Sequence, residues 1–212
     1  MKMDIYSTPS ILKETCNGYS SISILADFMA KREIYLMGQI DTDSAANLIL
    51  QLKHLENQDP DAEITIYINS PGGTVSDCLA VYDVMQTVSC PIRTVCIGTA
   101  ASCGAILFAA GNSREMLPHS QIMIHDPMIA GEGLTGSAGH LKDQIQNLMN
   151  IRKIIGDILA KHTGKTAEEI FEKTKTDSWF TADEAVEFGL ADHIIRQKNI
   201  KKNIQEREKS QL

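Results

Sequence analysis

A serine with small neighbours lies where a predicted strand turns into a predicted helix. The segment reads Gly98-Thr99-Ala100-Ala101-Ser102-Cys103-Gly104-Ala105; it follows a strand-like run at residues 94–97 and opens an apolar helix expected over residues 101–110. Unpaired N–H groups and the dipole of a helix N-terminus stabilise negative charge beside the Ser102 oxygen. These features favour a nucleophile that a substrate backbone can approach. Against this, serine is also a common helix cap, and the spacing is not that of the G-x-S-x-G elbow.

His125 and Asp177 are the candidates for a base and for the acid that orients it. His125 lies in a strand expected over residues 121–126, where a lone histidine is more often structural or exposed than catalytic. The neighbouring Asp126 is a tempting partner, but consecutive strand residues point to opposite faces. Asp177 lies between two predicted helices and could equally be a solvated loop acid, since the chain has 27 acidic residues.

Strand-like and helix-like segments alternate three times in the first half of the chain. Strands are expected at residues 34–38, 64–68 and 94–97, followed by helices at 41–57, 75–88 and 101–110, the last with Gly111 as its C-terminal cap. Such units form a mostly parallel sheet with helices outside, and sites lie at the carboxyl ends of its strands. Ser102 and the turn Ser70-Pro71-Gly72-Gly73 both fall at such ends. Without a G-x-G-x-x-G or a Lys-Ser/Thr signature, this turn predicts N–H groups that face a ligand other than a nucleotide.

The second half of the chain predicts one long helix and two short ones. The long helix, expected over residues 140–162 and ended by Gly164, has an apolar face too long for one core, which predicts packing against another subunit. Capping boxes at Thr166-x-x-Glu169 and Thr181-x-x-Glu184 mark the short helices. We divide the chain into an arm at residues 1–30, a main domain at 31–195 and a polar tail at 196–212. The tail is expected to be disordered, and the glycine-rich stretch at 130–139 to be mobile.

The overall composition narrows the class of protein. With 212 residues and a net charge of −7, the chain can bury a substantial core and lacks the basic surface of a nucleic-acid or anionic-membrane binder. It has neither an apolar signal core after the N-terminus nor an apolar run of membrane-span length, so we expect a cytoplasmic protein. The five cysteines have no metal-ligand spacing and are expected to be free thiols.

Several separated segments together resemble the proteolytic subunit of the Clp protease family. They occur in the family's order and at near-family spacing between residues 33 and 195. The segments are Tyr67-Ile68-Asn69-Ser70-Pro71-Gly72-Gly73, Gly98-x-Ala100-Ala101-Ser102-x-Gly104-Ala105, Leu117-Pro118-x-Ser120, Met123-Ile124-His125-x-Pro127 and His162-Thr163-Gly164. The resemblance implies an α/β fold of the kind that crotonases share, made of repeated ββα-type units with a protruding helix-strand handle at about residues 128–160.

The resemblance also implies a serine endopeptidase. Ser102 would be the nucleophile, His125 the general base and Asp177 the carboxylate that orients the imidazole. The backbone N–H groups of Gly73 and Cys103 would form the oxyanion hole. Extended substrate would bind as an added strand, and the residues implied for this are Thr74, Val75, Pro127, Met128 and Ile129.

By the same resemblance, heptameric rings would stack in pairs into a tetradecamer and enclose the active sites. An ATP-dependent AAA+ unfoldase would feed unfolded protein into this chamber for cleavage to short peptides. The chain itself has no nucleotide motif, so ATP would be used by that partner. Neither a cofactor nor a metal ion is expected in this subunit.

Several positions depart from the family pattern. Thr176 stands where the family has an arginine before the triad acid, and Lys175 cannot replace a bidentate guanidinium. Thr65 and Glu115 stand where the unfoldase pocket has aromatic residues, and residues 17–20 replace an Arg-Gly-Glu-Arg-like segment. These changes predict a divergent second paralogue that keeps its triad, docks an unfoldase poorly and works in mixed rings with a standard subunit.

Two other classes of protein stay open at this point. One is a catalytically weak or structural ring subunit whose complete triad is misaligned, and reaction of Ser102 with a fluorophosphonate would exclude it. The other is a crotonase-type acyl-CoA enzyme, which has the same fold and a paired N–H oxyanion hole. The Ala-Ser-x-Gly and Ile-His-x-Pro segments favour the peptidase over this enzyme.

Overall fold

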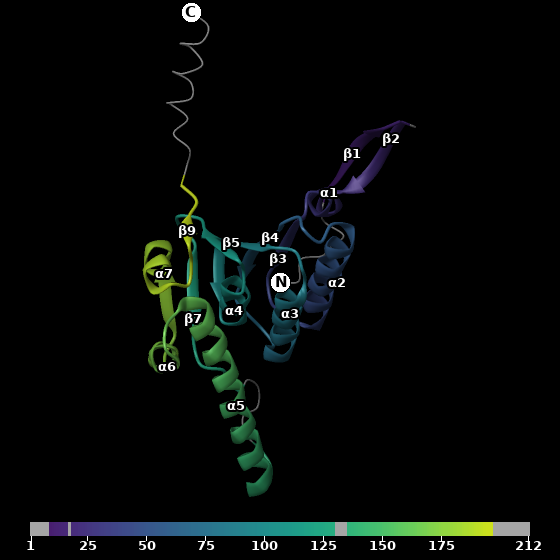
Figure 1. Cartoon of the computed structure of the whole chain (residues 1–212). Coiled ribbons are helices and arrows are strands. Elements are labelled where there is room, and N and C mark those ends of the chain that lie inside the picture. The colour runs from purple at the N-terminus through teal and green to yellow at the C-terminus, as the bar shows by residue number, and fades with distance from the viewer. Residues whose placement is uncertain (1–8, 17, 130–134, 197–212) are drawn as a thin grey trace, which may run out of the picture.

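The centre of the chain is a mostly parallel sheet (Figure 1). The computed structural model describes residues 9–16, 18–129 and 135–196, and within these ranges the sheet has seven strands. They are β3 (Glu33–Met37), β4 (Ile64–Ser70), β5 (Ile92–Ala101), β6 (Ser113–Met116), β7 (Gln121–Ile124), β8 (Ser178–Thr181) and β9 (His193–Ile194). The order in space is β3-β4-β5-β6-β9, with β7 beside the second half of β5. The β7–β8 pair is antiparallel, and the other described pairs of this sheet are parallel.

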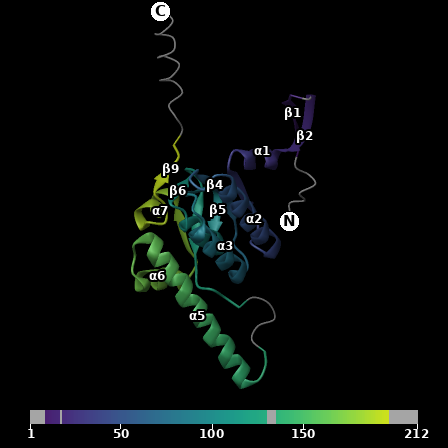
Figure 2. The same ribbon diagram turned by 45° about the vertical axis from the view of Figure 1, so that its right-hand side comes forward.

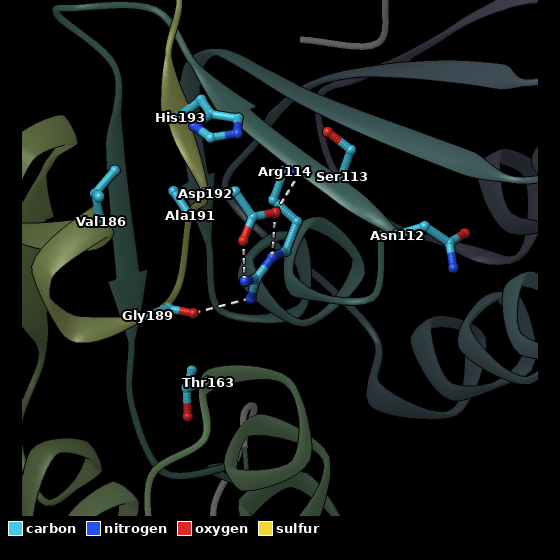
Figure 3. A pocket seen from close by; sticks show the side chains of 9 residues that line it. All are labelled: Asn112, Ser113, Arg114, Thr163, Val186, Gly189, Ala191, Asp192 and His193. Atoms are coloured by element: carbon cyan, nitrogen blue, oxygen red, sulfur yellow. Dashed lines mark hydrogen bonds and ion pairs between the residues drawn. The ribbon is translucent and has the colours of Figure 1, made fainter.

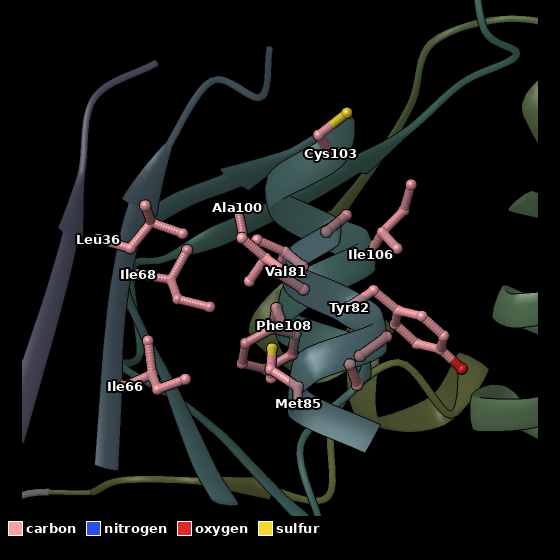
Figure 4. Close-up of a cluster of buried hydrophobic side chains, with 14 of the residues drawn as sticks. Leu36, Ile66, Ile68, Val81, Tyr82, Met85, Ala100, Cys103, Ile106 and Phe108 are labelled. Atoms are coloured by element: carbon pink, nitrogen blue, oxygen red, sulfur yellow. The ribbon is translucent and has the colours of Figure 1, made fainter. Parts of the chain in front are cut away.

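Three helices pack against this sheet and enclose the core: α2 (Thr42–Gln58), α3 (Val75–Thr87) and α4 (Cys103–Ala109). Figure 4 shows Ile68 of β4 facing Val81 of α3 and Phe108 of α4, and all three side chains are fully buried. Burial of such apolar side chains is the main driving force for this packing. The three predicted strand-then-helix units and the mostly parallel sheet are confirmed.

The helix ends follow the capping signals in the sequence. The remaining helices of the main domain are α5 (Ala138–Thr163), α6 (Ala167–Thr174) and α7 (Ala182–Phe188). Gly164 ends α5 in the left-handed conformation, at φ 72°. Both predicted capping boxes are present, and a third one starts α2; they pair Thr166 with Glu169, Thr181 with Glu184, and Asp41 with Ser44.

The junction before Ser102 differs from the prediction. β5 continues to Ala101 and α4 begins only at Cys103, so the expected strand is too short and the expected helix starts two residues early. The physical reason is that residues 99–101 pair with β7, which local sequence does not reveal. Gly111 is also not the expected left-handed cap, because the C-cap residue is Ala110, in the right-handed conformation, and the φ of Gly111 is not positive. A Cβ at Gly111 would lie 2.5 Å from the Thr94 hydroxyl, so glycine there allows close packing.

β5 has two different neighbours along its length. Its first half pairs with β6 as far as the Cys96–Met116 pair. Its second half pairs with β7, starting at Thr99 and Gln121. β6 and β7 therefore pair with successive halves of the same edge of β5, an arrangement that we call the fork in β5.

A bulge on the other side of β5 redirects its end. Between the Ile68 and Ser70 pairs, β5 advances by four residues while β4 advances by two. The Asn69 side chain fills this irregularity and accepts a hydrogen bond from the Thr99 N–H group (3.0 Å). A Cβ at Gly98 would lie 2.6 Å from the Asn69 oxygen, so a larger residue there would displace this side chain and its hydrogen bond to Thr99. Such bulges bend a strand and change the direction of the residues that follow.

Arg114 of β6 ties two helix ends to the sheet, and Figure 3 shows its bonds to Gly189 and Asp192. Its Nη1 donates to the carbonyls of His162, in α5, and Gly189, just after α7, at 2.7 and 2.9 Å. Its Nε and Nη2 both donate to the carboxylate of Asp192. Burial acts to raise the pKa of Asp192, but the hydrogen bonds from Arg114 outweigh it and hold that pKa below its usual value. One guanidinium thus satisfies carbonyls at the C-terminal ends of both helices.

A hairpin and a short helix precede the sheet. β1 (Ser10–Thr15) and β2 (Gly18–Ser23) pair antiparallel and project away from the body, followed by α1 (Ile24–Ala30) (Figure 1). The Phe28 ring of α1 packs on Tyr35 of β3 with centroids 5.1 Å apart. These elements lie in the arm predicted for residues 1–30, of which residues 1–8 and 17 lie outside the described ranges.

Helix α5 projects from the body over its N-terminal half (Figure 2). Ile158 and Leu159, near its C-terminal end, are buried, whereas Ile145, Met149 and Ile154 are each about half exposed. Exposed apolar side chains on this helix agree with the prediction that it packs on another subunit. Between β7 and α5 the described residues contain no strand, so the expected helix-strand handle is seen here as a helix. Residues 130–134 of the glycine-rich stretch, and residues 197–212 of the predicted tail, lie outside the described ranges.

No helix in the described part of the chain has the length and hydropathy that a membrane span requires. The cytoplasmic location expected from the sequence is a separate matter and stays a prediction.

We expect acid to destabilise this fold through His162, whose Nε2 contacts the Tyr82 hydroxyl at 3.1 Å. Burial, followed by the charges of Lys161 and Arg114, lowers the pKa of His162 from 6.5 to about 4. The unfolded chain therefore takes up this proton before the folded chain does. The stabilisation is complete above pH 6.5 and is lost as the pH falls from 6.5 through 4.

Thermal unfolding between pH 7 and pH 4.5 tests this expectation. The Tm of the wild type should fall more steeply with acidity than that of His162→Gln, which keeps a polar side chain near Tyr82 but cannot titrate. Equal slopes for the two proteins would contradict it.

Candidate active site

Ser102 lies at the junction of β5 and α4 with a strained backbone. Its φ of 55° and ψ of −121° fall in a region that residues other than glycine rarely adopt. The Ser102 N–H group donates to the carbonyl of Met123 in β7 (2.8 Å), which holds this turn. Its hydroxyl makes no capping bond to α4 and instead lies 2.8 Å from Nε2 of His125. Ser102 thus stands at the N-cap position of α4, but its side chain does not cap the helix. It occupies a strained strand-to-helix elbow despite its different motif.

His125 reaches Ser102 through the pairing of β5 with β7. Ala101 pairs with Met123, so Ser102 is one residue beyond this pair and His125 is two residues beyond it. The His125 side chain is 15% exposed and lies between Ser102 and Asp177. An imidazole in hydrogen-bond contact with a serine hydroxyl can accept its proton when that oxygen attacks an electrophile.

Asp177 approaches the other side of the imidazole from the loop between α6 and β8. Its Oδ1 lies 3.5 Å from Nδ1 of His125, which is within ion-pair range but long for a hydrogen bond. The Asp177 side chain is 64% exposed, and among the described residues we find no other partner for its carboxylate. Lys175, two residues earlier, pairs with Glu172 at 2.5 Å and does not brace it. The structure thus brings Ser102, His125 and Asp177 into one row, with the acid held least firmly.

Gly72 and Gly73 bring a stretch of backbone against the elbow. A Cβ at Gly72, whose φ is +95°, would lie 2.7 Å from the Cβ of Ser102, and one at Gly73 would lie 1.9 Å from the carbonyl oxygen of Ile40. Ile40 donates to the Gly72 carbonyl and accepts from Thr74 N–H, both at 2.9 Å. In extended backbone, the N–H and C=O of one residue point to the same side, and the next residue points to the other. The Gly73 N–H is therefore directed away from Ile40.

Cys103 lies on that same side of Gly73. Its thiol donates to the Gly73 carbonyl (3.3 Å), so the N–H and C=O of Gly73 both face Cys103. As the first residue of α4, Cys103 has an N–H group without a partner inside the helix. The thiol of Cys78 lies behind it and donates to the Cys103 carbonyl (3.5 Å). The contact between these thiols, together with burial, raises the pKa of Cys78, while the same contact lowers the pKa of Cys103.

A small pocket opens beside Ser102 and His125. Its other lining residues come from α3, α4, β7, α5 and the segment after β7, and nearly all are apolar: Val75, Cys103, Ile106, Ile124, Pro127, Ile155 and Leu159. The lining is therefore apolar apart from Ser102 and His125 at its mouth.

Two of the five residues implied for substrate binding line this pocket, namely Val75 and Pro127. Met128 and Ile129 lie outside it and are 64% and 42% exposed. Thr74 uses its N–H group to bind Ile40. The structure therefore brings Val75 and Pro127 to the pocket beside Ser102 and His125, and leaves Met128 and Ile129 exposed on the surface.

Sequence reasoning did not find the side chains that hold Asp126. Its carboxylate accepts hydrogen bonds from Arg152 Nε (2.7 Å) and Thr174 Oγ1 (2.6 Å). The prediction that Asp126 does not serve His125 agrees with these contacts, because it turns to α5 and α6. Its partners lie 26 and 48 residues further along the chain, and no local pattern marks them.

Comparison with known proteins identifies the family of this chain. A model of the Clp protease family matches residues 16–198. The chain belongs to the Clp protease family. The resemblance inferred from its motifs is confirmed, and with it the expectation of a serine-type endopeptidase subunit and of that family's α/β fold.

Two relatives in this Clp protease family are similar over nearly the whole chain. The ATP-dependent Clp protease proteolytic subunit 1 of Corynebacterium glutamicum is 40% identical over 199 residues, which cover 93% of this chain and 95% of that protein. The protein of the same name from Corynebacterium diphtheriae is 40% identical over 192 residues, or 90% and 91% of the two chains. These matches favour the peptidase over the crotonase-type alternative.

Replacing Gly73 with alanine should disable this Clp protease family subunit without unfolding it. The new Cβ would overlap the Ile40 carbonyl, so the backbone that carries the Gly73 N–H group must move. A displacement of about 1 Å is enough to lower turnover on the order of a hundredfold. Hydrolysis of a short fluorogenic peptide measures the effect.

Gly139→Ala in α5 is the matched control, because a Cβ there meets nothing within 4 Å. It should keep wild-type activity. Full activity of Gly73→Ala would show that this backbone takes no part in the reaction.

Proposed function

We propose that this subunit cuts unfolded polypeptides with Ser102 as nucleophile, His125 as general base and Asp177 as the orienting acid. The observation that carries the proposal is the 2.8 Å contact between Ser102 Oγ and His125 Nε2 at a strained turn. A serine hydroxyl is a poor nucleophile near neutral pH until a base accepts its proton. With the hydroxyl already against the imidazole, this transfer needs no rearrangement.

The proposed reaction follows from these positions. Ser102 Oγ attacks the scissile carbonyl carbon while its proton passes to His125 Nε2. The N–H groups of Gly73 and Cys103 donate to the oxyanion of the tetrahedral intermediate. His125 then gives the proton to the leaving amine, and the same imidazole later deprotonates the water that releases the acyl group. Asp177 accepts from Nδ1–H and so keeps the imidazole in the tautomer that this sequence requires.

Substrate would bind in extended form between residues 73–75 and 127–129. The backbone groups of these segments would pair with it as an added strand. The apolar pocket beside Ser102 would hold the side chain next to the cut, with Val75 and Pro127 among its walls. This arrangement favours cleavage after apolar residues.

The subunit would act in heptameric rings stacked in pairs, with an AAA+ unfoldase as partner. The half-exposed Ile145, Met149 and Ile154 on the projecting helix α5 support contact between rings. The relatives are named ATP-dependent, and their number 1 implies a second subunit type in those organisms. This supports mixed rings with a standard paralogue.

Two polar positions on the proposed docking face, beside the stacked rings of Tyr35 and Tyr67, support weaker binding of the unfoldase by this chain. Glu115 pairs with Arg93 at 2.7 Å, and Thr65 lies nearby on the adjoining strand β4, where aromatic residues are expected. An ion pair with partly buried partners offers little apolar area to a docking loop. In mixed rings, the second subunit would supply that contact.

A catalytically weak ring subunit is the second candidate. It is favoured by the exposure of Asp177 and by its 3.5 Å separation from His125, since a poorly held acid orients the imidazole poorly. The two candidates differ in whether the isolated protein turns over peptide.

The deciding experiment measures both the particle size of the purified full-length protein and the reactivity of its Ser102. We expect Ser102 to react with a fluorophosphonate probe and a fluorogenic peptide to be cleaved. Ser102→Ala should abolish both, and Asp177→Ala should lower kcat by about 10⁴-fold. A wild-type protein that forms rings but neither reacts nor cleaves would support the structural candidate instead.

A further inference from the structure

Asp126, the residue after His125, makes three hydrogen bonds to groups of α5 and α6. Its N–H group donates to the carbonyl of Thr174 (2.8 Å), and its Oδ1 accepts from the Thr174 hydroxyl (2.6 Å). Its Oδ2 accepts from Arg152 Nε (2.7 Å). Both carboxylate oxygens and the backbone are thus engaged by groups of α5 and α6, away from Ser102.

The same contacts also bear on Asp177. Thr174 is the last residue of α6, is 3% exposed and precedes Asp177 by three residues. Three residues of extended chain span at most about 10 Å, so a fixed Thr174 limits where Asp177 can lie. On the other side, Ser178 pairs with Ile124 of β7 and donates its hydroxyl to the Lys173 carbonyl (2.6 Å). The loop of Asp177 is therefore anchored at both ends while its own carboxylate is exposed.

Arg152 is itself fixed by packing. Its guanidinium lies 4.3 Å from the centre of the Phe171 ring, a cation–π contact between α5 and α6. Phe171 packs so closely on α5 that a Cβ at Gly156 would lie 2.3 Å from its ring. The Arg152 side chain is 23% exposed and the Asp126 side chain 33%. A charged, partly buried hydrogen bond with a packed partner has a defined geometry.

We propose that Asp126, Thr174 and Arg152 form a positioning clamp that sets the distance between the His125 imidazole and the Asp177 carboxylate. The inference rests on the proposed function, since it matters only if these two groups act together. The clamp links Asp126, which follows His125, to Thr174, which precedes Asp177 by three residues. It acts where this chain has Thr176 and no arginine to brace Asp177.

Thr174→Val and Thr174→Ser form the matched test in the full-length protein. Valine keeps the shape of threonine but cannot donate to Asp126, whereas serine can. We expect Thr174→Val to lower kcat for a fluorogenic peptide by about ten- to a hundredfold with KM changed less than about twofold. Thr174→Ser should stay within about twofold of the wild type. Asp126→Asn and Arg152→Met should resemble Thr174→Val, and Lys153→Met, which breaks an exposed pair on the same helix, should not.

The rate and the end point of Ser102 labelling separate positioning from loss of structure. With a fluorophosphonate, Thr174→Val should react more slowly but reach the wild-type end point, because every site is folded but misaligned. A lower end point with an unchanged rate would mean a partly unfolded population and would overturn the clamp. So would a wild-type kcat in Thr174→Val and Asp126→Asn. If the wild type itself neither reacts nor cleaves, the proposed function fails, and this inference fails with it.

Discussion

The hydrogen bond from the Ser102 amide to the Met123 carbonyl is the contact on which the site depends. Ala101 and Met123 are the last paired residues of β5 and β7. The bond from Ser102 extends this pairing by one residue, into the turn before α4. Because side chains alternate along a strand, a slip of one residue would turn His125 away from Ser102. The backbone strain at Ser102, about 1–3 kcal/mol, persists because the strand on one side and the buried helix on the other hold it in place.

The fork in β5 makes this pairing available. β6 occupies the first half of β5 and then leaves, so that β7 can take the second half. The step between them is a tight turn in which Leu117 N–H donates to the Cys96 carbonyl (3.0 Å) and the Ser120 hydroxyl donates to Leu117 O (2.7 Å). The segment Leu117-Pro118-x-Ser120, which was one of the motifs of the family resemblance, thus has a structural role.

The rest of the fold is tightly packed around the site, whereas parts further from it leave apolar and charged side chains exposed. All seven residues of α4, the helix that follows Ser102, are buried, and Arg114 binds the ends of α5 and α7 to the sheet. By contrast, the projecting half of α5 leaves apolar side chains exposed, and Asp177 lies in an exposed loop. Both features fit a subunit whose surface is completed by neighbours.

Local patterns in the sequence were sufficient for the strand-then-helix units, the capping boxes, the left-handed end of α5 at Gly164 and the opposite facing of His125 and Asp126. These depend on periodicity and on backbone chemistry within a few residues. The family motifs pointed to Ser102, His125 and Asp177 as a set. They did not give the distances among them.

Tertiary structure decided the features that join distant parts of the chain. The extension of β5 to Ala101 depends on pairing with a strand about 22 residues away, because the small residues at 98–101 have no periodic signature of their own. The same holds for the clamp of Asp126, whose partners on α5 and α6 no spacing rule connects. The sequence alone determined which residue types face the core, where α6 and α7 begin and where α5 ends, because those are local properties. The 2.8 Å and 3.5 Å separations around His125 were decided only by how the packed elements meet.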